Sequence, residues 1–329
     1  MRSVILRRFG GPDVLEVADV PLPEPGPGQV RIRVEAATVN PVDIATRTGA
    51  LQAAGLMRAG AFVALGWDAA GRIDALGDGV TRFERGEAVI GLRDRLVDRH
   101  GAQSEAVVLD ASAVARAPRG WDAAQSATLP LNGLTALQAL DQLGVAAGET
   151  LLVTGAAGAL GAFAVALASL RGARVIALVR TLADAPLLHD LGADHVLAVE
   201  PVELGHAVRR LHPGGADAAL DAAVIGIPAL DAVRNQGRFA AVAAGAAPPA
   251  LRGIEVRNVW IRADGAQLEL LSGLAANGRL RPRVADVLEL AAVASAHERL
   301  AAGGLRGRLV LAPTACPPSA RPEGVIPIG

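Results

Sequence analysis

Several residue types that common enzyme mechanisms require are absent from this chain. Its 329 residues contain no tyrosine and no lysine. A tyrosine acid paired with a lysine, as in short-chain dehydrogenases, is therefore excluded, and so is Schiff-base chemistry through a lysine amine. The only cysteine, Cys316, stands in a proline-rich tail, which excludes a disulfide framework, a structural zinc cluster and a cysteine ligand for a catalytic zinc. The histidines are not spaced as metal ligands, so we predict no metal site.

Charge and hydropathy narrow the range of partners. The net charge is −1, and no basic run is dense enough to bind a nucleic-acid backbone or an anionic membrane surface. Apolar stretches such as 156–170 are too short to cross a bilayer, and the N-terminus lacks the apolar core of a signal peptide. We therefore expect a cytoplasmic protein that binds small molecules, with no nucleic acid and no membrane as partner.

The most informative segment begins at a short apolar run, 151–153, of the kind that a buried parallel strand requires. Gly155, Gly158 and Gly161 follow at three-residue spacing, before an alanine-rich helix expected over 159–170. Such glycines permit a tight turn, close approach of a pyrophosphate to the backbone, and close packing of the helix on its strand. The N–H groups at the start of the helix would face the phosphates. The pattern predicts a dinucleotide-binding βαβ unit rather than an ordinary turn.

Arg180 closes this unit, at the end of a second apolar strand expected over 174–179. A carboxylate at this position would bind the adenosine ribose hydroxyls, whereas a guanidinium can hold a 2′-phosphate through charge-assisted hydrogen bonds. The sequence therefore favours NADPH over NADH. The alternative is that Arg180 is a solvated surface cation.

The first third of the chain has the pattern of short strands separated by turns, and a small, partly open β-barrel fits it. Strands are expected at 4–8, 15–20, 30–39, 70–73, 88–90 and 105–109.

From Trp121 onward, helices alternate with apolar strands, which indicates a parallel sheet. We expect a cofactor domain over 123–262, and a catalytic domain made of 1–122 and 263–329, with 313–329 as an extended tail. Expected helices are 131–143, 183–191, 227–235, 266–276 and 291–301, and expected strands are 196–199, 218–220, 238–243, 283–287 and 308–311.

A series of segments resembles, in order, the zinc-independent quinone oxidoreductases, the zeta-crystallin-like branch of the medium-chain dehydrogenase/reductase superfamily. The resemblance extends over about residues 1–312. It is carried by 39–43 (VNPVD), 47–49 (RTG), 66–71 (GWDAAG), 77–80 (GDGV), 86–89 (GEAV), 129–136 (LPLNGLTA), 155–161 (GAAGALG), 191–194 (LGAD) and 306–311 (RGRLVL).

The resemblance implies an α/β fold with a GroES-like, partly open β-barrel and a Rossmann, doubly wound parallel sheet. It implies hydride transfer from NADPH to a quinone or an α,β-unsaturated carbonyl, and a homodimer joined through the edge strand near 254–261. Two alternatives stay open. One is an enoyl reductase acting on a polyketide or acyl thioester, and the other is an NADPH-binding protein without net redox activity, such as a sensor or a cyclase.

The candidate site residues follow from the same segments. Asn40, Asp43 and Thr135 are the candidate catalytic residues. Asn40 would offer amide N–H donors to the nicotinamide carboxamide or to the developing oxyanion, and Thr135 would bind the same end of the cofactor. The alternatives are that Asn40 is a turn-former, Asp43 a helix cap and Thr135 a threonine bonded to its own helix. The cofactor is expected against Asn40, Thr135, Gly155, Ala156, Gly158, Ala159, Leu160, Gly161, Arg180, Thr181, Ala222, Ala243 and Arg308.

The chain departs from its relatives where several of them carry tyrosine or lysine. Ala45 and Leu51 stand at two tyrosine positions near the active site, so we expect a roomier and less polar pocket. Val199 replaces a tyrosine that stacks on the cofactor. Asp184 stands where some relatives hold the 2′-phosphate with lysine, which leaves that contact to Arg180.

Overall fold

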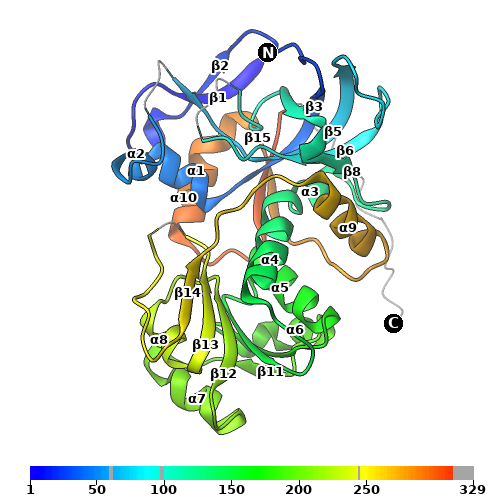
Figure 1. Cartoon of the computed structure of the whole chain (residues 1–329). Coiled ribbons are helices and arrows are strands. Elements are labelled where there is room, and N and C mark those ends of the chain that lie inside the picture. Colours follow the sequence, from blue (N-terminus) through cyan, green and yellow to red (C-terminus); the bar gives the residue numbers. More distant parts are fainter. Residues whose placement is uncertain (59–61, 97–99, 244, 314–329) are drawn as a thin grey trace, which may run out of the picture.

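The computed structural model describes residues 1–58, 62–96, 100–243 and 245–313, and the structural statements below concern this part of the chain. The chain forms a barrel-like domain and a domain built on a parallel sheet, with α4 and α10 between them (Figure 1). The tail prediction falls almost entirely on 314–329, outside the described residues.

The cofactor domain contains a six-stranded sheet in which every neighbouring pair is parallel. Its spatial order is β11-β10-β9-β12-β13-β14, so the chain starts in the middle, builds outward on one side, and then crosses to the other. This is the doubly wound topology, with its switch point between β9 and β12. The strands are β9 (Thr150–Thr154), β10 (Arg174–Leu178), β11 (His195–Leu197), β12 (Ala216–Asp221), β13 (Val233–Ala241) and β14 (Glu255–Asn258).

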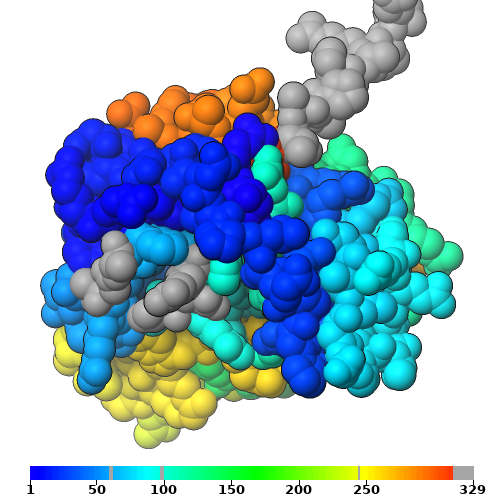
Figure 2. Space-filling view, turned by 90° about the horizontal axis from the view of Figure 1, so that it is seen from above, coloured from blue at the N-terminus to red at the C-terminus, as the bar shows by residue number. Residues whose placement is uncertain are grey.

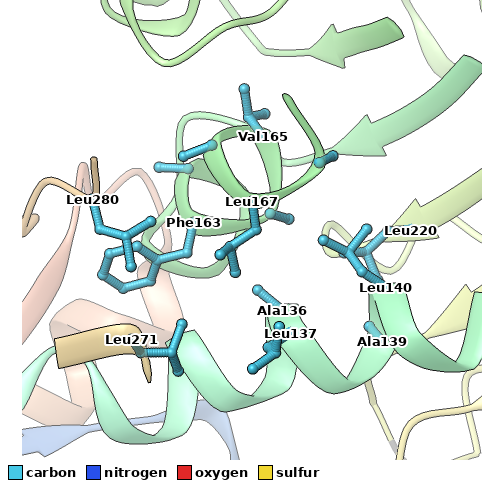
Figure 3. Packing of buried hydrophobic residues seen from close by; sticks show 14 of the residues in the cluster. Ala136, Leu137, Ala139, Leu140, Phe163, Val165, Leu167, Leu220, Leu271 and Leu280 are labelled. Carbon is cyan, nitrogen blue, oxygen red and sulfur yellow. The ribbon is translucent and has the colours of Figure 1, made fainter. Parts of the chain in front are cut away.

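Helices cover this sheet because its strands are apolar on both faces. Side chains of α4 and α5 interdigitate in one buried cluster with Leu220 of β12, and Leu271 of α9 and Leu280 join it at its edge (Figure 3). Small alanine side chains allow α5 to lie close to its neighbours. The helices of this part are α4 (Pro130–Leu143), α5 (Ala159–Leu170), α6 (Ala185–Asp190), α7 (Leu204–Leu211) and α8 (Ile227–Asp231), whereas α3 (Ala123–Ala127) and α9 (Gly265–Ala276) contact strands of the barrel.

The barrel-like domain is built around β3 (Gln29–Val39), which pairs with three strands, β5, β7 and β16, all antiparallel. A small sheet of order β2-β1-β4 adjoins it. The remaining elements are β1 (Arg2–Leu6), β2 (Glu16–Asp19), β4 (Val63–Ala64), β5 (Asp68–Leu76), β6 (Ala88–Leu92), β7 (Ala106–Asp110), β8 (Val114–Arg116), β15 (Val284–Glu289), β16 (Arg308–Ala312), α1 (Pro41–Arg47), α2 (Ala50–Ala53) and α10 (Val293–Ala302).

The last strands of the described part of the chain lie in the first domain. After α9, strand β15 pairs with β16, and β16 pairs with β3 through Leu309 and Val39. Seen from above, α10 borders the face made by the N-terminal segments, and part of the cofactor domain is visible behind them (Figure 2). The barrel contacts the start of α4, where Asp68 of β5 accepts from the N–H of Leu131 and Arg308 of β16 donates to Asn132.

Two local predictions differ from the structure. The helix expected over 227–235 ends at Asp231, because Val233 already pairs with Ala216 in the parallel sheet. The sequence reading also missed α7, although Leu204, Val208 and Leu211 repeat with a helical period. No helix among the described residues is long and apolar enough to span a membrane.

Candidate active site

The glycine turn (155–161) has the geometry that its sequence predicts. Gly155 follows β9 with φ of +59°, in the left-handed region that favours glycine. A Cβ on Gly161 would lie 2.3 Å from Gly155 O and 2.7 Å from the Cα of Ala156. Helix α5 can therefore pack against the turn only because residue 161 has no side chain. Gly158 is the N-cap of α5.

The first turn of α5 contains Ala159, Leu160 and Gly161, whose N–H groups have no acceptor within the helix itself. The N–H of Ala156 donates to Leu178 O at 3.1 Å, which ties the turn to the end of β10. The start of α5 is thus positioned as an anion-binding helix N-terminus beside the switch point.

The other predicted cofactor residues follow the carboxyl ends of neighbouring strands. Arg180 and Thr181 come after β10 and are exposed, whereas Ala222 and Ala243 come after β12 and β13 and are partly buried. Because the carboxyl ends of parallel strands lie at one edge of a sheet, these residues share the edge that carries the glycine turn.

Sequence reasoning missed a polar pair at the switch point. The Asp221 carboxylate is buried and accepts hydrogen bonds from Thr154 Oγ1 at 2.6 Å and from the N–H groups of Ile225 and Gly226. Thr154 Oγ1 in turn accepts from the N–H of Ala223 at 2.9 Å. These contacts hold the loop after β12 against the end of β9.

A buried polar network lies where the barrel meets α4. Its centre is Asp68 of β5, which is fully buried. One carboxylate oxygen accepts from Thr38 Oγ1 and from Asn40 Nδ2, and the other accepts from the N–H of Leu131 at 2.6 Å, in the first turn of α4. Burial raises the pKa of Asp68, while the hydrogen bonds from Thr38, Leu131 and Asn40 and the charge of Arg308 oppose that rise. The sequence placed Asp68 in a barrel signature but gave it no role.

Asn40 lies in this network with a different bonding pattern from the expected one. Its amide group donates to Thr38 Oγ1 at 2.9 Å and to Asp68 at 2.7 Å, so both N–H groups are used inside the protein. A carboxylate can only accept here, which fixes the amide nitrogen on the Asp68 side. Among the described residues, no donor reaches Asn40 Oδ1, which is buried. The Asn40 atom that has no partner among the described residues is therefore a hydrogen-bond acceptor. A role for Asn40 toward cofactor or substrate stays a prediction.

Asp43 caps the short helix α1, which is one of the two interpretations that the sequence allows for this residue. Its carboxylate accepts from the N–H of Asn40 at 2.8 Å and from the N–H of Gly66 at 3.1 Å. Burial raises the pKa of Asp43 to about 7, although the two backbone N–H groups act in the opposite direction. A role in relaying protons stays a prediction.

Thr135 and Arg308 each bond a residue in the first turn of α4. Thr135 Oγ1 donates to Leu131 O at 2.6 Å, within its own helix. The Arg308 guanidinium donates to Asn132 Oδ1 at 2.7 and 3.1 Å, which ties β16 to α4. Arg308 and Asp68 thus bind adjacent residues of the same helical turn, from two different strands of the barrel.

Two cavities in the described part of the chain lie elsewhere. One of about 270 Å³ is bordered by Glu24, Arg95 and Asp110, and one of about 130 Å³ by Glu35 and Trp121. Neither is lined by a predicted site residue. The candidate site therefore rests on the glycine turn and the network, which face the domain junction.

The family comparison covers both domains. Residues 26–119 match the alcohol dehydrogenase GroES-like domain, and residues 191–311 match a family described as zinc-binding dehydrogenase.

Among curated proteins, a quinone oxidoreductase of Pseudomonas aeruginosa is 38% identical over 186 residues, which are 56% of this chain. The match spans about half of that relative, 54% of its length.

Two solved structures are similar over nearly the whole chain. An NAD-dependent alcohol dehydrogenase has a TM-score of 0.82 at 32% identity, covering 95% of this chain and 99% of that one. A mycobacterial protein complexed with NADPH has a TM-score of 0.79 at 28% identity, covering 95% and 100%.

The family name implies zinc, and the side chains do not fit it. Within the described ranges, no group of three or more histidine, cysteine or acidic side chains could hold a metal ion. The buried carboxylates Asp43 and Asp68 already accept hydrogen bonds from backbone N–H groups. The residue between Gly66 and Asp68 is Trp67, whose side chain is not a zinc ligand. Zinc prefers cysteine or histidine ligands in tetrahedral sites, and the only cysteine lies outside the described residues. No step of the proposed reaction is assigned to a metal.

The fold predicted from the sequence is a GroES-like barrel joined to a Rossmann domain. It is confirmed by the GroES-like family match, by the parallel sheet, and by the alcohol dehydrogenase structure that covers 95% of this chain. The chain belongs to the medium-chain dehydrogenase/reductase superfamily and, within it, is similar to the quinone oxidoreductases.

Proposed function

We propose that the chain is a reductase that transfers a hydride from NADPH to an electron-poor carbon of a quinone or an α,β-unsaturated carbonyl. The observation that carries the proposal is the glycine turn at the switch point of the sheet, on the edge that meets the barrel. When bound there, the nicotinamide supplies the hydride. The names of the relatives agree with this chemistry.

The residues of the cofactor domain bind and orient the dinucleotide. The N–H groups at the start of α5 hold the pyrophosphate, and the missing side chain of Gly158 lets it approach the backbone. Arg180 is exposed just beyond β10 and, within the described part of the chain, has no carboxylate partner. It is thus available for the 2′-phosphate, which favours NADPH.

The network at the domain junction positions the nicotinamide end. Asp68 spans the junction by binding Asn40 in the barrel and Leu131 in α4, so it fixes the barrel against the helix that carries Thr135. We assign Asn40 Oδ1 to accept a hydrogen bond from the nicotinamide carboxamide, because that oxygen is the unused member of the network. This revises the donor role expected from the sequence.

Proton delivery needs no tyrosine or lysine. After hydride transfer the negative charge lies on the carbonyl oxygen, and a hydroquinone anion or an enolate takes its proton from water without a strong acid. Asp43, with a pKa near neutrality, is the described carboxyl group best suited to exchange that proton.

We further propose that the enzyme works in the cytoplasm, which supplies NADPH, and as a homodimer. Strand β14 pairs with β13 on one side only, and Trp260 just beyond it is 57% exposed. An open strand edge beside an exposed apolar side chain favours pairing with a second copy. Light scattering of the purified protein tests this; a monomeric mass would contradict it.

Stopped-flow measurement of NADPH absorbance tests the reductase proposal. The purified protein is mixed with NADPH and, separately, with quinones, enones and an enoyl thioester. We expect rapid oxidation with quinones or enones. Oxidation of NADPH with the thioester alone would indicate that the protein is an enoyl reductase. Tight NADPH binding without oxidation by any of them would contradict catalysis and leave a nucleotide-binding role.

A further inference from the structure

The surroundings of Asp184 contain more positive charge than the sequence suggests. Asp184 lies four residues after Arg180, at the start of α6, and only 8% of it is exposed. A carboxylate beside a 2′-phosphate would repel it unless cations neutralise it. The sequence leaves Arg180 as the one basic group at this point.

Two further arginines reach Asp184 from the other domain. Arg306 Nε lies 3.2 Å from Asp184 Oδ1, and Arg283 Nη2 lies 3.9 Å from the same oxygen. Arg283 directly precedes β15, and Arg306 stands just before β16. Both therefore belong to the barrel domain, more than 90 residues away from Asp184 in the sequence.

Arg283 has donor capacity that the structure does not use. Its side chain is only 12% exposed, and no acceptor among the described residues reaches its buried Nη1. Burial lowers the pKa of Arg283; Asp184 opposes this and Arg306 adds to it. A guanidinium held near a second cation, with one N–H group unpaired, is suited to accept an anion.

Arg180 belongs to the same patch. A Cβ on Gly304 would lie 3.7 Å from Arg180 Nη2, so the guanidinium lies against the loop that leads to Arg306. Arg283 and Arg306 flank a single carboxylate, and Arg180 lies against the loop that leads to Arg306, so the positive charge gathered here exceeds what Asp184 neutralises. One dianionic phosphate would balance it.

We propose that Arg306 and Arg283 join Arg180 in a two-domain site for the 2′-phosphate of NADPH. This rests on the proposed use of NADPH. Phosphate oxygens would receive N–H donors from both domains, so the phosphorylated cofactor would bridge the barrel and the sheet, and NADH would not. The competing reading is that Asp184, Arg283 and Arg306 form only an ion bridge between domains.

Binding of four ligands to the full-length protein distinguishes these readings. Dissociation constants are measured by calorimetry for NADPH, NADH, 2′,5′-ADP and 5′-AMP, which form two pairs differing by one phosphate. The variants are Arg306→Ala, whose side chain is 55% exposed, Asp184→Asn, and Arg281→Ala as the matched control. Arg281 lies two residues before Arg283 and pairs with Asp190 on the surface.

We expect Arg306→Ala to weaken NADPH and 2′,5′-ADP on the order of tenfold, as for the loss of one charge-assisted hydrogen bond, with NADH and 5′-AMP unchanged. Asp184→Asn should strengthen the phosphorylated pair, because it removes a competing anion. Arg281→Ala should change neither pair.

Equal effects of Arg306→Ala on both pairs, or no effect, would overturn the proposal, as would weaker 2′,5′-ADP binding in Asp184→Asn. If the wild-type protein binds both dinucleotides and the variants give such results, only the two-domain site is refuted. A wild-type protein that binds neither dinucleotide refutes the proposed function and the site with it.

Discussion

Asp68 shows how a single buried carboxylate can connect two domains. It accepts hydrogen bonds from Thr38 and Asn40 in the barrel and from the N–H of Leu131 at the start of α4. A carboxylate at a helix N-terminus is stabilised by the unpaired N–H groups and the helix dipole. The side chain therefore offsets part of the cost of its own burial, and it fixes the helix that carries Thr135.

Removal of this carboxylate is expected to affect stability. Asp68→Ala should lower the free energy of unfolding by about 3 kcal/mol or more, because three buried donors lose their acceptor. Urea denaturation measures the change. Asp190→Asn, at a side chain that is 63% exposed, is the control and should change stability by less than about 0.5 kcal/mol. Equal stability of Asp68→Ala and wild type would contradict the role given to the network.

Arg180 is the residue on which the cofactor preference depends most directly. Arg180→Ala should weaken NADPH binding roughly tenfold and leave NADH binding unchanged, because only the 2′-phosphate contact is lost. Fluorescence titration with both cofactors measures the ratio. An unchanged preference would show that the phosphate is bound by other residues.

At the scale of elements, the turn between β9 and α5 depends on the absence of side chains. Gly161 lies so close to Gly155 O that a Cβ has no room, and the obstructing atoms are backbone atoms. By contrast, Gly273 in α9 has open space around it, with nothing within 4 Å of an added Cβ. The two glycines thus occupy helices for different reasons, and one tolerates replacement.

The matched pair Gly161→Ala and Gly273→Ala tests this difference. Gly161→Ala should displace α5 from the turn, lower stability by about 1–3 kcal/mol and weaken dinucleotide binding. Gly273→Ala should raise stability by up to about 1 kcal/mol, since alanine favours a helix. Thermal unfolding with and without NADPH measures both. Similar effects of the two variants would contradict the close-packing argument.

The sequence predicted those elements whose pattern is local. Helix α5 has the bounds expected for it, and its three glycines have the expected spacing and geometry. The start of β13 was missed, because pairing of Val233 with Ala216 overrides a local helical pattern.

The site was predictable to the same extent. Asn40, Asp43 and Thr135 could be named from their segments, and the local bonds of Asp43 and Thr135 were among the predicted alternatives, but the bond of Asn40 to Asp68 could not be predicted. The contacts of Asp68 with Leu131 and of Arg306 with Asp184 join residues far apart in the sequence. Nothing in the local sequence around Asp68 or Arg306 indicates a long-range partner. These contacts can therefore be identified only from the three-dimensional fold.

At the scale of the whole molecule, two buried groups give stability opposite dependences on pH. His297 in α10 is fully buried, and no partner reaches its ring among the described residues. Burial, together with the nearby charge of Arg47, lowers its pKa to about 4. Asp43, by contrast, has a pKa raised to about 7 by burial.

The signs follow from proton binding. Between about pH 6.5 and 4 the unfolded chain protonates His297 and the folded protein does not, so this group lowers stability as the pH falls, by roughly 3 kcal/mol in total. Between about pH 7 and 3.8 the folded protein protonates Asp43 first, so this group raises stability as the pH falls. The two effects oppose each other over most of this range.

Replacement of His297 should leave the opposing effect of Asp43 on stability. His297→Gln should remove the acid-sensitive contribution, so the difference in unfolding free energy between variant and wild type should shift in favour of the variant as the pH falls from about 6.5 to 4. Urea denaturation across this range measures it. A constant difference for His297→Gln would contradict the burial of a neutral ring.

We propose that this chain transfers a hydride directly from NADPH to carbon. NADPH that carries deuterium at both C4 positions of the nicotinamide is incubated with an enone, and the label is located in the product by NMR. We expect deuterium at the β-carbon, with the second hydrogen, at the α-carbon, taken from water. Product without deuterium, or no product from any enone or quinone, would contradict it.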